Sequence, residues 1–162
     1  MSAARLARKA RLLRWAMNLY PPFLGAGIRV RHISADLRRV QIRMGLGWYN
    51  RNYVGTQFGG SLYAMTDPFY MLMIMENLGR DYIVWDKAAN IEFISPGKGP
   101  VFADFEIDEA LLERIRSHTA DGERYLPQLH VEVRDAEGVL VARVQKTLYV
   151  RLKPGRRKRT TT

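Results

Sequence analysis

Positions 50–79 hold a single carboxylate in almost uncharged surroundings. Asp67 is the only charged residue between Arg51 and Glu76. Burying such a carboxylate costs free energy unless it is paired or hydrogen-bonded. This arrangement indicates a catalytic carboxylate. The structural alternative is a helix cap, because Asp67 precedes Pro68 and an Asp before a Pro is a good start for a second helix.

A glycine pair comes shortly before this carboxylate. Gly59 and Gly60 lie at or just before the predicted start of a long apolar helix. Bare glycines let a ligand approach the backbone closely. The first helical turn also offers unpaired N–H groups, which suit a carbonyl oxygen that gains negative charge during acyl transfer. Tight packing against a strand explains the glycine pair equally well.

The distance between the two features predicts a dimer. Asp67 is seven residues beyond Gly60, which corresponds to about 10 Å along a helix. One substrate carbonyl cannot contact both positions in the same chain. Two such helices packed antiparallel across a two-fold axis would place Asp67 of one subunit opposite Gly59 and Gly60 of the other. Pro68 should kink this helix or break it into two pieces.

The elements that must position these residues can be read from apolar periodicity. Alternating segments predict strands, and spacings of three and four predict helices. An amphipathic helix is expected over 3–20, ended by Pro21 and Pro22, and a second one over 108–118. Strands are expected over 28–33, 37–46, 82–95, 101–107, 129–134 and 139–152. The order predicts an α+β domain in which about six antiparallel strands wrap around the long central helix.

The charge of the chain is concentrated at its ends. The net charge is +10, yet residues 15–150 have a balance of −1, because residues 1–14 and 151–162 are basic and contain no acid. We expect a basic N-terminal helix over 1–22, a globular domain over 23–152 and a basic disordered tail over 153–162. The tails either solubilise the protein or contact an anionic partner such as membrane lipid or nucleic acid. A neutral domain weakens a nucleic-acid interpretation.

Composition excludes several classes of site. There is no cysteine, so disulfides, thiolate chemistry and zinc bound by cysteine are excluded. This fits a cytoplasmic protein. His32, His118 and His130 are scattered without metal-ligand spacing, and we expect each to be structural and no metal site to exist. No apolar run reaches the roughly 18 residues of a membrane span.

Two motifs resemble those of a known superfamily. The residues that carry the resemblance are Asn52, the run from Gly55 to Gly60, Asp67 and the segment 90–96. The sequence resembles the hotdog-fold acyl-CoA thioesterases, in particular a bacterial branch related to the tetrameric enzymes. The resemblance covers roughly residues 27–152. It implies a hotdog fold, in which an antiparallel sheet wraps around a helix, with the N-terminal helix as an addition.

The resemblance also implies roles for individual residues. Asp67 falls at the position of the nucleophile or general base, Gly59 at that of the N–H that polarises the thioester carbonyl, and Asn52 at that of an orienting amide. The family histidine is replaced by Phe58, which cannot form the same hydrogen bond. Gln57 either replaces this contact or faces solvent. The expected substrate-binding positions are Gln57, Phe58, Gly60 and Ser61.

The sequence therefore predicts a metal-independent thioesterase that forms a homodimer or a homotetramer. Its substrate would be an acyl-CoA or a related thioester, and it would need no cofactor apart from the coenzyme A of the substrate. The alternative is a non-catalytic hotdog domain that binds acyl chains or acyl-CoA. A third hypothesis is an accessory domain that associates with a membrane or with RNA through its basic ends.

Overall fold

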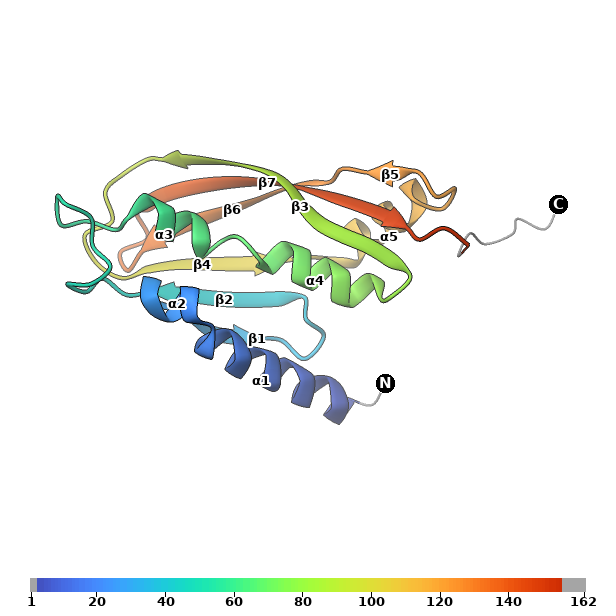
Figure 1. Ribbon diagram of the computed structural model, residues 1–162, viewed down its shortest axis with the longest axis horizontal. Helices are drawn as coiled ribbons and strands as arrows, with labels where there is room; N and C mark the ends of the chain where they lie inside the picture. Colours follow the sequence, from blue (N-terminus) through green and yellow to red (C-terminus); the bar gives the residue numbers. More distant parts are fainter. Residues whose placement is uncertain (1–2, 156–162) are drawn as a thin grey trace.

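The computed structural model describes residues 3–155, and the chain folds into one antiparallel sheet with helices packed against it (Figure 1). The helices are α1 (Ala3–Leu19), α2 (Pro21–Ala26), α3 (Gly59–Ala64), α4 (Phe69–Leu78) and α5 (Glu109–His118). The strands are β1 (Ile28–Ile33), β2 (Arg39–Met44), β3 (Tyr82–Phe93), β4 (Val101–Glu106), β5 (Arg124–Tyr125), β6 (Gln128–Asp135) and β7 (Leu140–Leu152). Helices α3 and α4 lie across one face of the sheet, and α1 lies along the β1 edge (Figure 1). The predicted α+β architecture is confirmed.

Seven strands form the sheet within the described residues, one more than the sequence suggested. Their order is β1-β2-β4-β6-β7-β3, and β5 pairs with β7. Every pairing is antiparallel. The additional strand, β5, has only two residues, which is too short for an alternating pattern to reveal.

The core lies between the sheet and the broken central helix. Strand β4 alternates strictly and buries Val101, Ala103 and Phe105. The ring of Phe105 lies 5.1 Å from those of both Phe69 and Tyr70 at the start of α4. Burying an aromatic side chain of this kind stabilises the fold by roughly 2–3 kcal/mol. These contacts fix the position of α4 on the sheet.

The central helix is divided near a proline, and the N-terminal helix ends before one, so that α1 (Ala3–Leu19) matches the helix predicted over 3–20. The central helix is interrupted between Ala64 and Phe69, so it consists of α3 and α4, as Pro68 predicted. The N-terminal segment also continues beyond the expected stop. Pro21 ends α1 but occupies the first turn of α2, where its missing N–H group costs nothing.

The two edges of the sheet differ in how they are covered. At the β1 edge, Asn18 of α1 accepts a hydrogen bond from the N–H of Val30 at 2.8 Å and donates one to its carbonyl at 3.1 Å. At the other edge, β3 pairs only with β7 within the described residues, and its positions 87–90 are exposed. Exposed edge strands are ready templates for pairing with another chain.

Candidate active site

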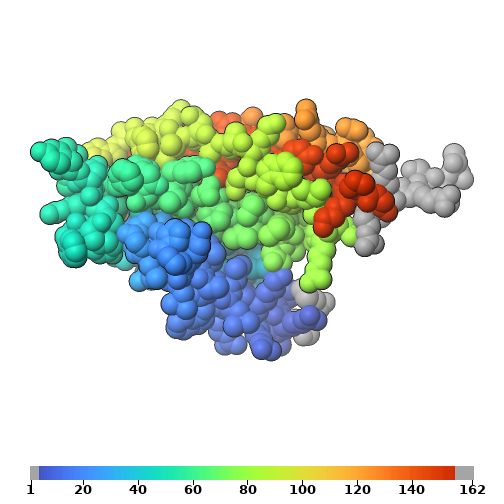
Figure 2. All heavy atoms as spheres, in the orientation of Figure 1, coloured from blue at the N-terminus to red at the C-terminus, as the bar shows by residue number. Residues whose placement is uncertain are grey.

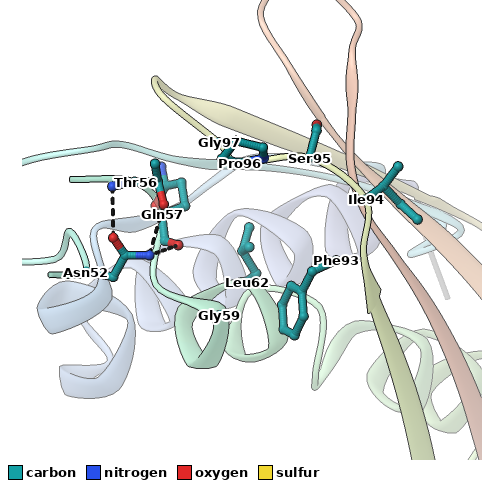
Figure 3. A pocket seen from close by; sticks show the side chains of 10 residues that line it. All are labelled: Asn52, Thr56, Gln57, Gly59, Leu62, Phe93, Ile94, Ser95, Pro96 and Gly97. Atoms are coloured by element: carbon teal, nitrogen blue, oxygen red, sulfur yellow. Dashed lines mark hydrogen bonds between the residues drawn. The ribbon is translucent and has the colours of Figure 1, made fainter. Parts of the chain in front are cut away.

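One cavity collects several of the residues singled out from the sequence. It has a volume of about 430 Å³ and lies between the loop that precedes α3 and the segment that follows β3 (Figure 3). Asn52, Gln57 and Gly59 line it together with apolar side chains from α3 and β3, among them Leu62 and Phe93. The structure thus brings three predicted residues together, but Asp67 does not line this cavity.

Gln57 anchors the loop and does not face solvent. Its side chain is buried, and the amide nitrogen donates hydrogen bonds to the carbonyls of Gly45 at 3.2 Å and Gly99 at 3.0 Å. Its backbone N–H donates to the carbonyl of Gly97. These contacts join the loop to the segment after β3. Gln57 therefore shapes the cavity wall, and its position as a substrate contact stays a prediction.

Asn52 uses its amide within the same loop. Its oxygen accepts the N–H of Thr56 at 2.9 Å, and its nitrogen donates to the Thr56 hydroxyl at 2.9 Å and the Gln57 carbonyl at 3.3 Å (Figure 3). Gly55 completes the turn with φ of 82°, a value that glycine adopts without strain. Asn52 thus holds the turn closed, which is a positioning role rather than a free hydrogen-bonding group.

The start of α3 lies against two aromatic rings. A Cβ atom at Gly59 would lie 3.0 Å from the ring of Phe93, and one at Gly60 would lie 2.5 Å from the ring of Phe58. Phe58 itself is 54% exposed. Ser61 is buried in the first turn of α3, so it does not face the open cavity in a single chain.

Asp67 lies in the break between α3 and α4, and its carboxylate caps neither helix. Helix α4 has no side-chain cap. Instead, the Asp67 carboxylate accepts a hydrogen bond from the Lys146 ammonium at 2.8 Å. The same ammonium forms an ion pair with Asp86 of β3 at 2.9 Å. The side chain of Lys146 is fully buried, while that of Asp67 is 46% exposed.

Three residues, from the helix break, β3 and β7, therefore form a partly buried charge cluster, which we call the Lys146 cluster: Asp67, Asp86 and Lys146. A β-bulge in β3 falls between Asp86 and Ala88. Such a bulge redirects side chains, and here the register pairs Asp86 with Leu148 and Ala89 with Lys146. The cluster thus depends on the broken helix and on the irregular strand.

Burial and charge act against each other in this cluster. Burial of Lys146 acts to lower its pKa, but the hydrogen bonds and charges of the two carboxylates outweigh burial and raise the pKa of the ammonium. Burial raises the pKa of Asp86, and Lys146 offsets only part of that change. Lys146 is therefore held charged, and it presents a positive charge to the half-exposed carboxylate of Asp67.

Tyr63 completes the surroundings of this carboxylate. The Lys146 ammonium lies 5.3 Å from the centroid of its ring, within the range of a cation–π contact. Burial raises the pKa of the Tyr63 hydroxyl, and the neighbouring Asp67 carboxylate acts in the same direction. The phenol is therefore neutral and able to donate a hydrogen bond next to Asp67.

Sequence reasoning missed Lys146, although a signal was present. The even-numbered residues of β7 from Ala142 to Leu152 are buried, and Lys146 is the one charged residue among them. A lysine in the apolar register of a strand is rarely fully buried unless it is paired. That register anomaly identifies Lys146 but not its partners, because pairing with Asp67 spans 79 positions of the chain.

Comparison with known protein families identifies one family to which the chain belongs. The model of a family described as Domain of unknown function (DUF4442) matches residues 8–150. The chain belongs to this family. No curated protein sequence matches it.

Solved structures with the same fold include several named thioesterases. A Pseudomonas aeruginosa protein described as a probable thioesterase superimposes with a TM-score of 0.79 at 17% identity, covering 88% of this chain and 95% of its own. A thioesterase from Haemophilus influenzae gives 0.66 at 15% identity, covering 92% and 94%. Thioesterase superfamily member 2 from Mus musculus gives 0.62 at 16% identity, covering 87% and 96%. The predicted hotdog fold is thereby confirmed.

Proposed function

We propose that this protein is a thioester hydrolase that acts on an acyl-CoA or a related thioester, with Asp67 as its general base or nucleophile. The observation that carries the proposal is the Lys146 cluster. Burying a lysine costs free energy unless the ammonium is paired with an opposite charge. Here the buried Lys146 pairs with a carboxylate that is half exposed at a helix break. A charged, accessible and fixed carboxylate is what either role requires.

The chemistry balances in both forms. As a base, Asp67 takes a proton from water, and the resulting hydroxide attacks the thioester carbonyl. As a nucleophile, the carboxylate attacks the carbonyl itself, and water then hydrolyses the mixed anhydride. In both forms the carbon–sulfur bond breaks and the thiolate leaves and takes up a proton. The N–H of Gly59 would donate a hydrogen bond to the carbonyl oxygen as negative charge develops on it.

The proposal needs a second copy of the chain. Asp67 and Gly59 of one chain lie in different places, the first in the Lys146 cluster and the second in the cavity. The exposed edge of β3 is where a second sheet could pair, as strand edges do. An isologous dimer built there would bring Asp67 of one subunit toward Gly59 of the other.

The primary experiment measures hydrolysis of acyl-CoAs of different chain lengths and of aryl-CoAs. The protein as found is compared with Asp67→Asn, and the matched control is Asp121→Asn, an exposed carboxylate in a loop. Loss of a general base should reduce turnover by a factor of about 100 to 10,000. Equal rates for all three proteins, after circular dichroism has shown that they fold, would refute the proposal.

Mixing two inactive variants tests whether the site is shared. Asp67→Asn and Gly59→Val should each be inactive as homodimers. A heterodimer of the two contains one site with an intact Asp67 and an intact Gly59. Random exchange in an equal mixture should restore about a quarter of the native sites. No recovery despite confirmed subunit exchange would show that each site lies within one subunit.

A non-catalytic acyl-binding protein is the second candidate, and Phe58 favours it. The ring is exposed next to the cavity where the related thioesterases are expected to have a hydrogen-bonding histidine. The cavity wall also includes Leu62, Phe93 and Ile94, which suit an acyl chain. Saturable acyl-CoA binding without turnover, unchanged by Asp67→Asn, would support this candidate over hydrolysis.

A further inference from the structure

Helix α1 has apolar residues on two opposite sides, and the core explains only one of them. Ala10 is buried, and Leu13 and Met17 pack beside it against the sheet and α4. A second stripe, which we call the outer stripe, follows the heptad-like spacing of positions on one side of a helix. Its members are Arg5, Arg8, Leu12, Trp15 and Leu19.

The apolar half of the outer stripe is largely exposed. Leu12, Trp15 and Leu19 are 58%, 59% and 64% exposed. The apolar surface continues into α2, where Tyr20 and Leu24 are also exposed. Figure 2 shows α1 and α2, in blue, on the outside of the molecule with no other element over them. A contiguous apolar patch of this kind on a surface helix marks an interaction site.

The other half of the outer stripe is cationic. Helix α1 contains no acidic residue. Lys9 forms an ion pair with Glu76, but no ion pair within residues 3–155 involves Arg5, Arg8 or Arg11. An open groove of about 950 Å³ beside α1 is lined by Arg5, Arg8 and Arg80 together with the Lys9–Glu76 ion pair. The surface therefore combines unpaired positive charge with exposed Leu and Trp side chains.

We propose that the outer faces of α1 and α2 dock the protein on an anionic lipid bilayer. Membrane-surface helices combine Arg or Lys side chains that attract anionic lipids with Trp, Leu or Phe side chains that enter the headgroup boundary. The arginines bind lipid phosphates, and Leu12, Trp15 and Leu19 enter the boundary between headgroups and acyl chains. Among the described residues no helix is long and apolar enough to cross a membrane, so the helix lies along the surface.

Charge and shape favour a bilayer over other occupants. A second copy of α1 packed antiparallel across a two-fold axis would place Arg5 and Arg8 against the apolar end of the partner helix, where no acid is present to pair with them. Nucleic acid would satisfy the arginines but would leave Leu12, Trp15 and Leu19 in contact with a charged backbone. Only a surface with phosphate outside and hydrocarbon inside complements both halves of the stripe.

Vesicle flotation with the protein of residues 1–162 tests the proposal. The vesicles are made of phosphatidylcholine alone or with phosphatidylglycerol added. We expect binding only to the anionic vesicles, weakened by salt. Arg5→Gln/Arg8→Gln should weaken binding roughly thirtyfold, since each arginine near such a surface contributes about a factor of five. Leu12→Ser/Trp15→Ser should weaken it at least as much at low salt.

Matched controls separate this surface from others. Arg114→Gln/Arg124→Gln removes the same charge from exposed positions in α5 and β5 and should leave binding unchanged. Deleting 156–162, which carries four basic residues, should leave binding dependent on α1. In a Trp48→Phe/Trp85→Phe background, the fluorescence of Trp15 should shift to the blue on vesicles and be quenched by brominated acyl chains.

Several outcomes would overturn the proposal. One is an absence of binding to anionic vesicles, and another is equal binding to both vesicle types. Binding that survives both α1 variants but is lost with 156–162 would assign it to the tail. A change in solution mass with the α1 variants and no vesicle binding would assign the stripe to self-association. Tight RNA binding lost in the arginine variant, without vesicle binding, would assign it to nucleic acid.

Discussion

The loop before α3, which contains Asn52 and Gln57, and the Lys146 cluster are both built from polar side chains. They differ in whether these side chains bond to the main chain or to other side chains. In the loop, Asn52 and Gln57 bond mainly to main-chain atoms. In the cluster, Lys146 contacts the charged side chains of Asp67 and Asp86. Bonds to the main chain fix the shape of a loop. Bonds between charged side chains fix the position of one accessible carboxylate. In the proposed thioesterase, the loop would form the wall of the site and the cluster would supply its reactive group.

Removing the buried ammonium of Lys146 should have the largest effect on stability. Lys146→Met leaves Asp67 and Asp86 close together without a compensating charge, so the free energy of unfolding should fall by about 3 kcal/mol. Urea denaturation measures this loss. Lys146→Met/Asp86→Asn should recover a large part of it, because the buried carboxylate is then neutral. Lys98→Met, at an exposed lysine, should change stability by less than about 0.5 kcal/mol. A similarly small effect at Lys146 would show that the cluster is not held by charge.

A substitution in the loop should lower the free energy of unfolding by less, and this loss should not depend on pH. Gln57→Ala removes two buried hydrogen bonds, to the carbonyls of Gly45 and Gly99, which contribute about 1 kcal/mol each. The loss of about 2 kcal/mol should be the same at acid and neutral pH, because no titrating group is involved. Denaturation at both pH values checks it. A loss that changed with pH would mean that the loop is coupled to a charged group.

The cluster, unlike the loop, should also make stability depend on pH through the titration of Asp86. Because its pKa is raised in the folded protein, the folded state holds the proton more tightly than the unfolded state. The resulting stabilisation is fully present below the ordinary carboxyl pKa near 3.8 and is lost as pH rises through the raised value. Asp86→Asn removes this dependence. The melting temperature of each protein should be compared with its own value at about pH 4. As pH rises, the melting temperature should fall more in the native protein than in Asp86→Asn. Parallel curves would contradict the shift.

Local patterns in the sequence predicted most of the elements but not the cluster. The bounds of β1 match the expected strand over 28–33, and the helix breaks at Pro68 as expected. Backbone preferences act over a few residues, so they can be read locally. The partners of Lys146 and the extra residue in β3 depend on long-range pairing, which no local pattern contains. The role of Asp67 was predicted from its isolation among apolar residues, while its partner became visible only in three dimensions.

The smallest expected effect on stability concerns the glycines of α3, and it separates packing from ligand approach. A methyl group at Gly59 would lie 3.0 Å from the ring of Phe93, and at Gly60 it would lie 2.5 Å from the ring of Phe58. Both rings are more than half exposed and can turn aside. Alanine also favours the helix by up to about 1 kcal/mol.

Gly59→Ala and Gly60→Ala should therefore each stay within about 0.5 kcal/mol of the native stability in urea denaturation. Turnover should nevertheless fall more than tenfold in Gly59→Ala, because the methyl group blocks the approach of a thioester carbonyl to the N–H. If stability fell by about 2 kcal/mol while the remaining folded protein kept full turnover, the glycine at position 59 would serve packing against β3. The carbonyl contact would then have to be sought elsewhere in the cavity wall.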